Sequence, residues 1–185
     1  FGKSVDAQAR LQSRARIDRL CNIVMRISIL AVGKKMPAWV YDCCDDYFQR
    51  LPSDYQINVQ EIALEKRSKN QSAEKTRMRE TQRLLQMVPE NDFIVALTED
   101  GQAISTRKFA GRIERLRDES RNISFLIGGP DGLDFSVQNN GLKHWPDWRC
   151  SLSLLTFPHP LVRVILAEQI YRAWSVLAGH PYHRD

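Results

Sequence analysis

Apolar positions follow two different periods along the chain, and these periods alternate. Short runs that are wholly apolar, or in which apolar and polar residues alternate, are typical of strands. Between them, apolar residues recur every three or four positions, which indicates helices. The predicted strands cover residues 26–33, 55–64, 92–97, 123–127 and 151–155, and the predicted helices cover residues 37–50, 72–87, 105–119 and 161–177.

This order of strands and helices predicts an α/β domain with a mostly parallel sheet flanked by helices. Residues 65–71 form a polar, basic loop in this prediction, and residues 98–102 form a turn. The segment 133–149 has no clear period and is compatible with a short helix. Ligands of such sheets bind outside the carboxyl ends of the strands. We therefore expect a pocket where the third, fourth and fifth strands end, at residues 97–98, 127–129 and 155–157.

The positive charge is concentrated at the start of the chain. The net charge is +5, and residues 1–24 contribute five basic against two acidic residues. This segment starts with Phe, and Met25 directly precedes the first strand, so we expect it to be vector-derived or to lie upstream of the true start. The alternative is a basic arm that touches RNA. The domain proper, residues 25–185, carries little excess charge and should bind naked RNA weakly.

The four cysteines, Cys21, Cys43, Cys44 and Cys150, form no CxxC pair. That spacing supports neither a zinc site nor a redox motif, and we expect free thiols in a reducing cytoplasm and no bound metal. The chain contains no apolar run near the roughly 20 residues that a membrane span needs. Residues 1–24 also lack the apolar core of a secretory signal, so a cytoplasmic protein without a membrane partner is expected.

Two punctuated segments follow the predicted strands of the last third. Residues 128–132 (GGPDG) could let the backbone approach a ligand closely, although a plain tight turn fits equally well. They match neither the dinucleotide-binding nor the P-loop fingerprint. In the second segment, prolines flank His159 and hold the chain extended before the last helix. A stiff segment of this kind could read an adenine edge, or it could be a rigid loop in which His159 is structural.

The last helix and the tail combine apolar and polar chemistry. Glu168 and Arg172 are four residues apart, which is the spacing of an ordinary surface ion pair. The helix is otherwise so apolar that we expect it to meet a partner, most simply a second copy of the chain. In the tail, Tyr182, His183 and Arg184 could stack on an unpaired base and hold a phosphate; the alternative is a disordered tail.

Taken together, these segments resemble the bacterial SPOUT-class methyltransferases that modify a pseudouridine of large-subunit ribosomal RNA at ring nitrogen 3. The resemblance begins at Met25 and continues to the end of the chain. Several long motifs in the same order make it specific. They are residues 31–37 (AVGKKMP), 126–133 (LIGGPDGL), 151–153 (SLS), 156–164 (TFPHPLVRV), 167–169 (AEQ), 171–175 (YRAWS) and 180–184 (HPYHR).

The resemblance implies a trefoil knot near the C-terminus, an obligate homodimer, S-adenosylmethionine bound in the knot, and a substrate presented by the assembled ribosome. Positions matching the family's cofactor contacts are Leu97, Gly129, Leu152, Ser153, Leu154, Leu155, Thr156 and Phe157. Positions matching an active site shared across the dimer are His159, Glu168, Arg172, Tyr182, His183 and Arg184. The chain departs from the family in residues 1–24, which have no counterpart, and around residues 134–149, which are somewhat longer.

Methylation at a ring nitrogen requires loss of a weakly acidic proton, and a positioned side chain can accept it. His159, Glu168 and His183 are the candidates, and the sequence does not choose among them. Arg172 and Arg184 could stabilise negative charge on the base, and Tyr182 could orient it. Two other functions stay open: a non-enzymatic ribosome- or RNA-binding module of the same fold, and a methyltransferase acting on transfer RNA.

Overall fold

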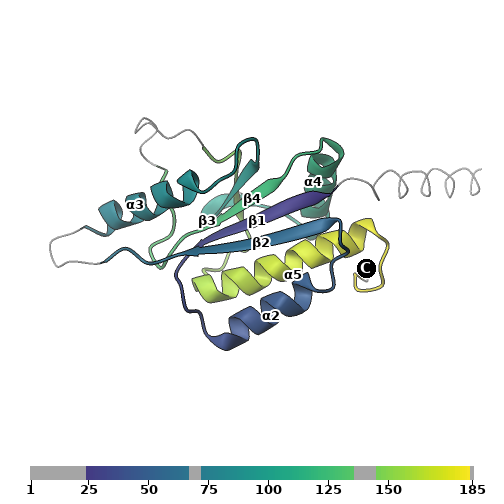
Figure 1. Cartoon of the computed structure of the whole chain (residues 1–185), viewed down its shortest axis with the longest axis horizontal. Helices are drawn as coiled ribbons and strands as arrows, with labels where there is room; N and C mark the ends of the chain where they lie inside the picture. The colour runs from purple at the N-terminus through teal and green to yellow at the C-terminus, as the bar shows by residue number, and fades with distance from the viewer. Residues whose placement is uncertain (1–23, 67–71, 136–144, 184–185) are drawn as a thin grey trace, which may run out of the picture.

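A computed structural model of the chain describes residues 24–66, 72–135 and 145–183. Its five strands form one parallel sheet in the order β2-β1-β4-β3-β5, and helices cover both faces (Figure 1). The predicted α/β architecture is therefore confirmed. In chain order the elements are β1 (Met25–Val32), α2 (Ala38–Phe48), β2 (Tyr55–Ile62), α3 (Ala73–Gln86), β3 (Phe93–Ala103), α4 (Thr106–Asp118), β4 (Ile123–Ile127), β5 (Trp148–Ser151) and α5 (His159–Leu177).

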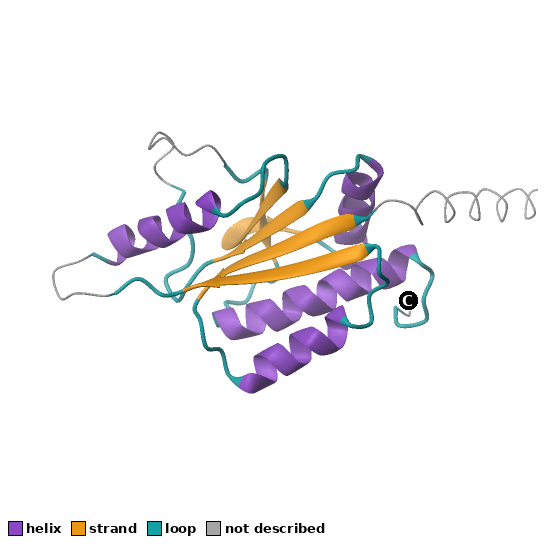
Figure 2. Ribbon diagram, in the orientation of Figure 1, coloured by secondary structure: helices purple, strands orange, loops and turns teal. Residues whose placement is uncertain are grey.

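The two faces of the sheet pack against different helices, as Figure 2 shows. One face packs against α4 and α5, with Phe109, Ile113, Leu166 and Ile170 fully buried in the larger core. The other face packs against α3, through Leu84 and Leu85 in a smaller core. The central strands β1 and β4 are buried along nearly their whole length. This burial on both sides explains why their sequences are almost continuously apolar.

The prediction of a turn at residues 98–102 is wrong, because β3 continues to Ala103. The strand pairs with β5 up to Leu97, loses register, and pairs with it again from Gln102. The four residues between form a bulge, in which the polar Glu99 and Asp100 are exposed. Gly101 permits it: a Cβ there would lie 2.6 Å from the backbone carbon of Cys150, closer than a real side chain can come.

The fifth strand is also displaced from its prediction. It was expected at residues 151–155 but runs from Trp148 to Ser151. The side chain that fixes it is Trp148, which is buried with its ring 6.3 Å from that of Phe109 and 4.5 Å from the guanidinium of Arg112. The apolar Leu154 and Leu155 that suggested a strand are instead exposed. The chain after Ser151 is thus a loop, free to line a site.

Helix boundaries follow from local capping. The predicted cap of α4 is confirmed, since the Ser105 hydroxyl accepts a hydrogen bond from the backbone N–H of Lys108. Helix α5 begins at His159, two residues before its predicted start, with Pro158 at the cap position and Pro160 in the first turn. A first turn tolerates proline because its N–H groups have no helical acceptor.

Parts of three predictions lie outside the described residues. The segment 136–144 contains most of the expected short helix, and the flanking residues 133–135 and 145–147 are not helical. Most of the basic loop 65–71 and the expectations for residues 1–23 fall outside the description in the same way.

The connections of the sheet determine where a site can form. From β1 the chain passes through α2 to β2, on one side, whereas from β4 it reaches β5 on the opposite side. Loops that leave adjacent parallel strands in opposite directions open a crevice at the carboxyl edge of the sheet. Here Gly33 directly follows β1 and Gly128 directly follows β4, so the chain leaves both strands through a glycine.

Candidate functional site

A cavity of about 1050 Å³ lies at the carboxyl ends of β3, β4 and β5, beside the first turn of α5. This is the edge at which the sequence predicted a pocket. Three backbone segments form most of its wall: residues 97–100 of β3, residues 127–135 after β4, and residues 149–153 with 155–159 between β5 and α5. Side chains of Arg77 and Val162 complete the wall.

The wall after β4 is a tight turn that only glycine can form. A Cβ on Gly128 would lie 2.5 Å from the carbonyl carbon and oxygen of Gly132, so no side chain fits there. Across the turn, the N–H of Gly132 donates to the carbonyl oxygen of Gly129 over 3.0 Å. Gly132 itself has φ +80°, a left-handed conformation that favours glycine. The GGPDG motif therefore builds a compact backbone surface on the cavity.

The wall between β5 and α5 is shaped by its own serines. The Ser151 hydroxyl donates to the carbonyl oxygen of Ser153 over 2.7 Å, and the N–H of Leu155 donates to the Ser153 hydroxyl over 2.9 Å. Such local bonds hold an irregular loop in one conformation. The predicted cofactor residues that line the cavity are Leu97, Gly129, Leu152, Ser153, Leu155, Thr156 and Phe157. Leu154 does not line it and is 95% exposed.

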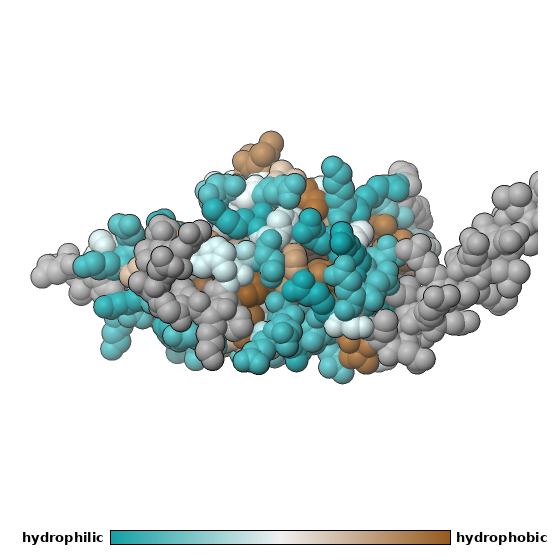
Figure 3. Space-filling model, turned by 90° about the horizontal axis from the view of Figure 1, so that it is seen from above, coloured by the Kyte–Doolittle hydropathy of each residue, from teal (hydrophilic) through white to brown (hydrophobic). Residues whose placement is uncertain are grey.

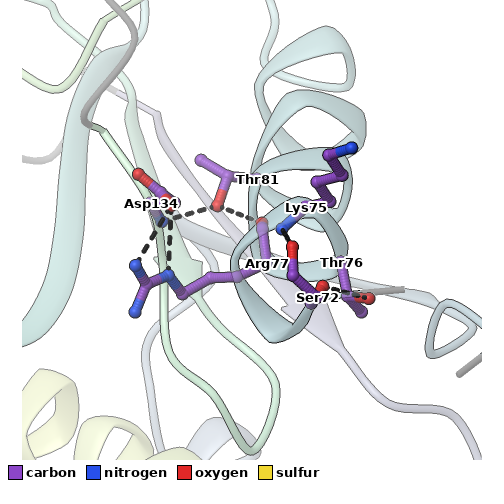
Figure 4. Close-up of polar contacts among 6 residues, drawn as sticks. All are labelled: Ser72, Lys75, Thr76, Arg77, Thr81 and Asp134. Carbon is purple, nitrogen blue, oxygen red and sulfur yellow. Dashed lines mark hydrogen bonds and ion pairs between the residues drawn. The ribbon is translucent and has the colours of Figure 1, made fainter. Parts of the chain in front are cut away.

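Helix α3 supports the cavity from the other face of the sheet, through a contact that the sequence did not indicate. Arg77 donates to the Asp134 carboxylate from Nε over 3.2 Å and from a terminal nitrogen over 3.1 Å (Figure 4). On the next turn of the helix, the Thr81 hydroxyl accepts from the backbone N–H of Asp134 over 2.9 Å and donates to the Arg77 carbonyl. This group of three residues, the α3 clasp, fixes the chain leaving the GGPDG turn.

The α3 clasp gives a stability prediction. Thr81→Val removes the acceptor of a buried N–H group, which should lower the free energy of unfolding by about 1–3 kcal/mol. Thr76→Val is the matched control: Thr76 is on the same helix and equally buried, but its hydroxyl makes only a long bond of 3.4 Å to the Ser72 carbonyl. Urea unfolding of both variants measures the difference, and hydrogen exchange should be faster at Asp134 only in Thr81→Val. Equal losses would show that the clasp adds no stability.

Two of the charged side chains that line the cavity, Arg149 and Asp100, are paired. Arg149 donates to both carboxylate oxygens of Asp100, over 2.5 and 2.6 Å. This contact lowers the pKa of Asp100, which stays ionised. Cys150 belongs to the same wall, but its side chain is buried, and burial raises the pKa of its thiol to about 12. A thiol that stays protonated at neutral pH is a poor nucleophile, so Cys150 is not suited to covalent catalysis.

His159 is the one predicted catalytic residue, among those the structure describes, that lines this cavity. It lies in the first turn of α5 and is half-buried. Burial, and then the positive charge of Arg163, lower the pKa of His159 below its ordinary value. The imidazole is therefore neutral at pH 7 and has a nitrogen that can accept a proton.

A second polar group, the tail cluster, lies further along α5 and consists of Glu168, Arg172 and Tyr182. Glu168 accepts from Nε of Arg172 over 2.6 Å and from the Tyr182 hydroxyl over 3.2 Å. The guanidinium of Arg172 lies 4.9 Å from the centre of the Tyr182 ring. Burial, followed by hydrogen bonding to Tyr47, raises the pKa of Tyr182, so its hydroxyl stays a donor at neutral pH. The predicted ion pair is present, and it holds the tail against the helix.

The structure does not bring the tail cluster to the cavity within one chain. Along a helix with a rise of about 1.5 Å per residue, Glu168 lies roughly 14 Å and Arg172 roughly 20 Å beyond His159. Neither they nor Tyr182 line the cavity. His183 is half-buried in the tail, and Arg184 lies outside the described residues. The predicted catalytic residues thus fall into two groups.

Two expected absences can be examined only over the described ranges. Within them, no group of His, Cys, Asp or Glu side chains is arranged to hold a metal ion. No helix in the same ranges combines the length and apolarity needed to cross a membrane. Cys43, Cys44 and Cys150 are free thiols there, and Cys21 lies outside.

Comparison with known proteins gives consistent matches over nearly the whole chain. Residues 25–183 match a family model described as "Predicted SPOUT methyltransferase". A protein of Thioalkalivibrio sulfidiphilus, named ribosomal RNA large subunit methyltransferase H, is 46% identical over 163 residues, which cover 87% of this chain and all of the relative. Proteins with the same name from Chromohalobacter salexigens and Hahella chejuensis are 44% and 43% identical over 160 and 161 residues, again covering all of each relative.

Proposed function

Because the chain belongs to the SPOUT methyltransferase family, we propose that it methylates a pseudouridine of large-subunit ribosomal RNA at ring nitrogen 3, using S-adenosylmethionine. The observation that carries this proposal is the cavity at the carboxyl edge of the sheet, with its glycine turn, its serine loop and a neutral histidine. The relatives named above share their full length with this chain, and their printed name specifies a methyltransferase of large-subunit ribosomal RNA.

The cavity suits a ligand of the size and polarity of S-adenosylmethionine. Small-molecule sites typically measure roughly 300–1000 Å³, and this cavity reaches about 1050 Å³. Its backbone-rich walls offer carbonyl and N–H groups, which can read an adenine edge, next to apolar side chains. Leu97, Gly129 and the loop 152–157 are the residues that would hold the cofactor. When bound, S-adenosylmethionine supplies an electrophilic methyl group.

The side chains of the site provide the rest of the chemistry. The target nitrogen must lose its proton, and His159, Glu168 and His183 are the candidate acceptors. Arg172 and Arg184 would stabilise the negative charge that develops on the base. Tyr182, whose hydroxyl donates to Glu168, would orient the base against the tail cluster.

A homodimer would unite the two groups of predicted catalytic residues, with the tail cluster of one chain completing the cavity of the other. Exposed apolar side chains support such an interface: Trp39 on α2 is 45% exposed and Leu161 on α5 is 38% exposed. In Figure 3, which views the molecule from above, hydrophilic residues predominate and apolar residues form only small patches. We therefore expect the interface to involve α2 and α5, and light scattering to give twice the chain mass of 21.4 kDa.

The proposal includes the assembled ribosome as substrate, a cytoplasmic location and a trefoil knot. The substrate is the assembled ribosome, because a domain of low net charge gains little from non-specific attraction to free RNA. This substrate places the protein in the cytoplasm. The trefoil knot expected from the family resemblance would bring the loops around the cavity together near the C-terminus.

Methyl transfer from labelled S-adenosylmethionine tests the proposal. The acceptors are intact ribosomes lacking this methylation, free large subunits, and transfer RNA. We expect label in large-subunit RNA, and only when whole ribosomes are supplied. Label in transfer RNA would instead favour the alternative substrate. Absence of label from every acceptor, with protein that is dimeric and binds the cofactor, would favour a non-enzymatic binding module of the same fold.

A further inference from the structure

Arg163, on the second turn of α5, is a buried cation that none of the roles above uses. Its side chain is 5% exposed. One terminal nitrogen donates to the carbonyl oxygens of Val32 over 3.0 Å and of Gly33 over 2.7 Å, and the other pairs with Glu61. Val32 is the last residue of β1, Gly33 follows it, and Glu61 lies near the end of β2. A single guanidinium therefore attaches α5 to the carboxyl edge of the sheet.

His159 lies one turn before Arg163, on the same face of the helix. The two side chains meet at Gly33. A Cβ placed on Gly33 would lie 3.6 Å from Nε2 of His159 and 3.6 Å from the terminal nitrogen of Arg163 that holds the carbonyls. Gly33 has φ +102° and carries no side chain, and the space beside it is shared by the two residues of α5 and by Met36, whose Cε would lie 2.9 Å from the same Cβ. The imidazole is thus confined between the helix and the end of β1.

We propose that Arg163 is a positioning residue for methyl transfer, which fixes the imidazole of His159 against Gly33 at the cavity wall, ready to accept the proton of the target base. This inference rests on the proposed function and on His159 as the acceptor. It goes further by assigning the residue that holds the acceptor in place. A purely structural Arg163 would anchor the helix and leave the titration of His159 unaffected.

The surrounding charges favour the neutral imidazole. Arg163 is the cation that acts on His159, and it lowers the pKa in addition to burial. Glu61 faces Arg163 from β2 and offsets part of its charge. The other charged groups of the cavity include two pairs, Asp100 with Arg149 and Arg77 with Asp134, and also Glu99 and Asp131. The pKa of His159 in the folded protein lies below the unfolded value of about 6.5. The contribution of the neutral imidazole to the stability of the fold is therefore fully present above a pH of about 6.5. It is lost as the pH falls through the folded pKa.

The decisive experiment combines histidine NMR with single-turnover methyl transfer to ribosomes across a pH series. The variant is Arg163→Met, which keeps the length of the side chain but removes its charge and donors. We expect the NMR pKa of His159 to rise, the acid limb of the rate profile to shift to higher pH by the same amount, and the plateau rate to fall about tenfold. Arg163→Lys should retain most of the pKa shift but lose the plateau rate, because a lysine cannot hold two carbonyls and a carboxylate in one fork.

Two further variants keep the test decisive if Arg163→Met does not fold. Glu61→Gln leaves Arg163 less compensated, so the pKa of His159 and the acid limb should both move lower, opposite to Arg163→Met. Arg115→Met removes an exposed cation, paired with Glu119 on α4, and should change neither quantity. The proposal is overturned if the pKa of His159 is the same in all folded variants, or if His159→Gln retains the rate and the acid limb of the original protein. The NMR result needs no methyl transfer, so it stands apart from failure of the proposed function.

Discussion

Gly128→Ala is expected to weaken binding of S-adenosylmethionine by roughly 100-fold or more, equivalent to about 2.7 kcal/mol. The added Cβ would lie 2.5 Å from two backbone atoms of Gly132, and backbone cannot move aside as a flexible side chain can. The turn must open, which displaces Gly129 and the wall of the cavity. Isothermal titration calorimetry measures the affinity, and thermal unfolding reports the accompanying loss of stability.

Gly111→Ala is the matched control for this change. Gly111 lies on the exposed side of α4, and a Cβ there would meet no other atom within 4 Å. Alanine is a better helix former than glycine, so this variant should be more stable by up to about 1 kcal/mol, with unchanged cofactor affinity. If Gly128→Ala binds the cofactor as tightly as Gly111→Ala does, the glycine turn is not part of the cofactor site.

Glu168→Ala should lower the single-turnover rate of methyl transfer about 100-fold or more, while cofactor affinity stays near that of the original protein. The carboxylate accepts from Arg172, Tyr182 and the side chain of Gln169, and the alanine variant leaves all three without their shared acceptor. Loss of a positioned acid–base or charge-stabilising group typically costs factors of about 10²–10⁴. Rapid-quench measurement on ribosomes at saturating cofactor isolates this step.

Glu119→Ala provides the control for Glu168→Ala, since Glu119 forms an ion pair with Arg115, four residues before it, at the exposed end of α4. It is expected to leave both rate and affinity unchanged. Near-normal single-turnover rates for both Glu168→Ala and His183→Ala would show that neither side chain takes part in catalysis. A fall in cofactor affinity alone would place Glu168 in the cofactor site instead, against the separation seen along α5.

The sequence predicted the layers of this fold well because its central strands are buried on both sides. Strands β1 and β4 are almost continuous apolar runs, which is the pattern of a strand that is buried on both faces. The prediction of the fifth strand was wrong for a physical reason. Leu154 and Leu155 are apolar but exposed, whereas the strand is fixed by Trp148, whose burial depends on Phe109 and Arg112 from a distant helix. Periodicity cannot reveal such a contact.

The candidate site, too, could be predicted from the sequence only in part. Its glycines and serines stand out in the sequence because turns and irregular loops require those residue types. The residues that support it do not, because their partners are far away along the chain: Arg77 binds Asp134 57 positions later, and Arg163 binds Glu61 102 positions earlier. Within one helix, in contrast, the Glu168–Arg172 pair was predictable from its spacing alone.

Mass spectrometry of nucleosides from large-subunit RNA, after reaction of this protein with unmethylated ribosomes, identifies the methylated product. We expect one new nucleoside, a pseudouridine carrying a methyl group at ring nitrogen 3, which is absent when Gly128→Ala replaces the original protein. A methyl group on another base or another atom, or an unchanged nucleoside profile with protein that binds S-adenosylmethionine, would show that the protein does not have the proposed activity.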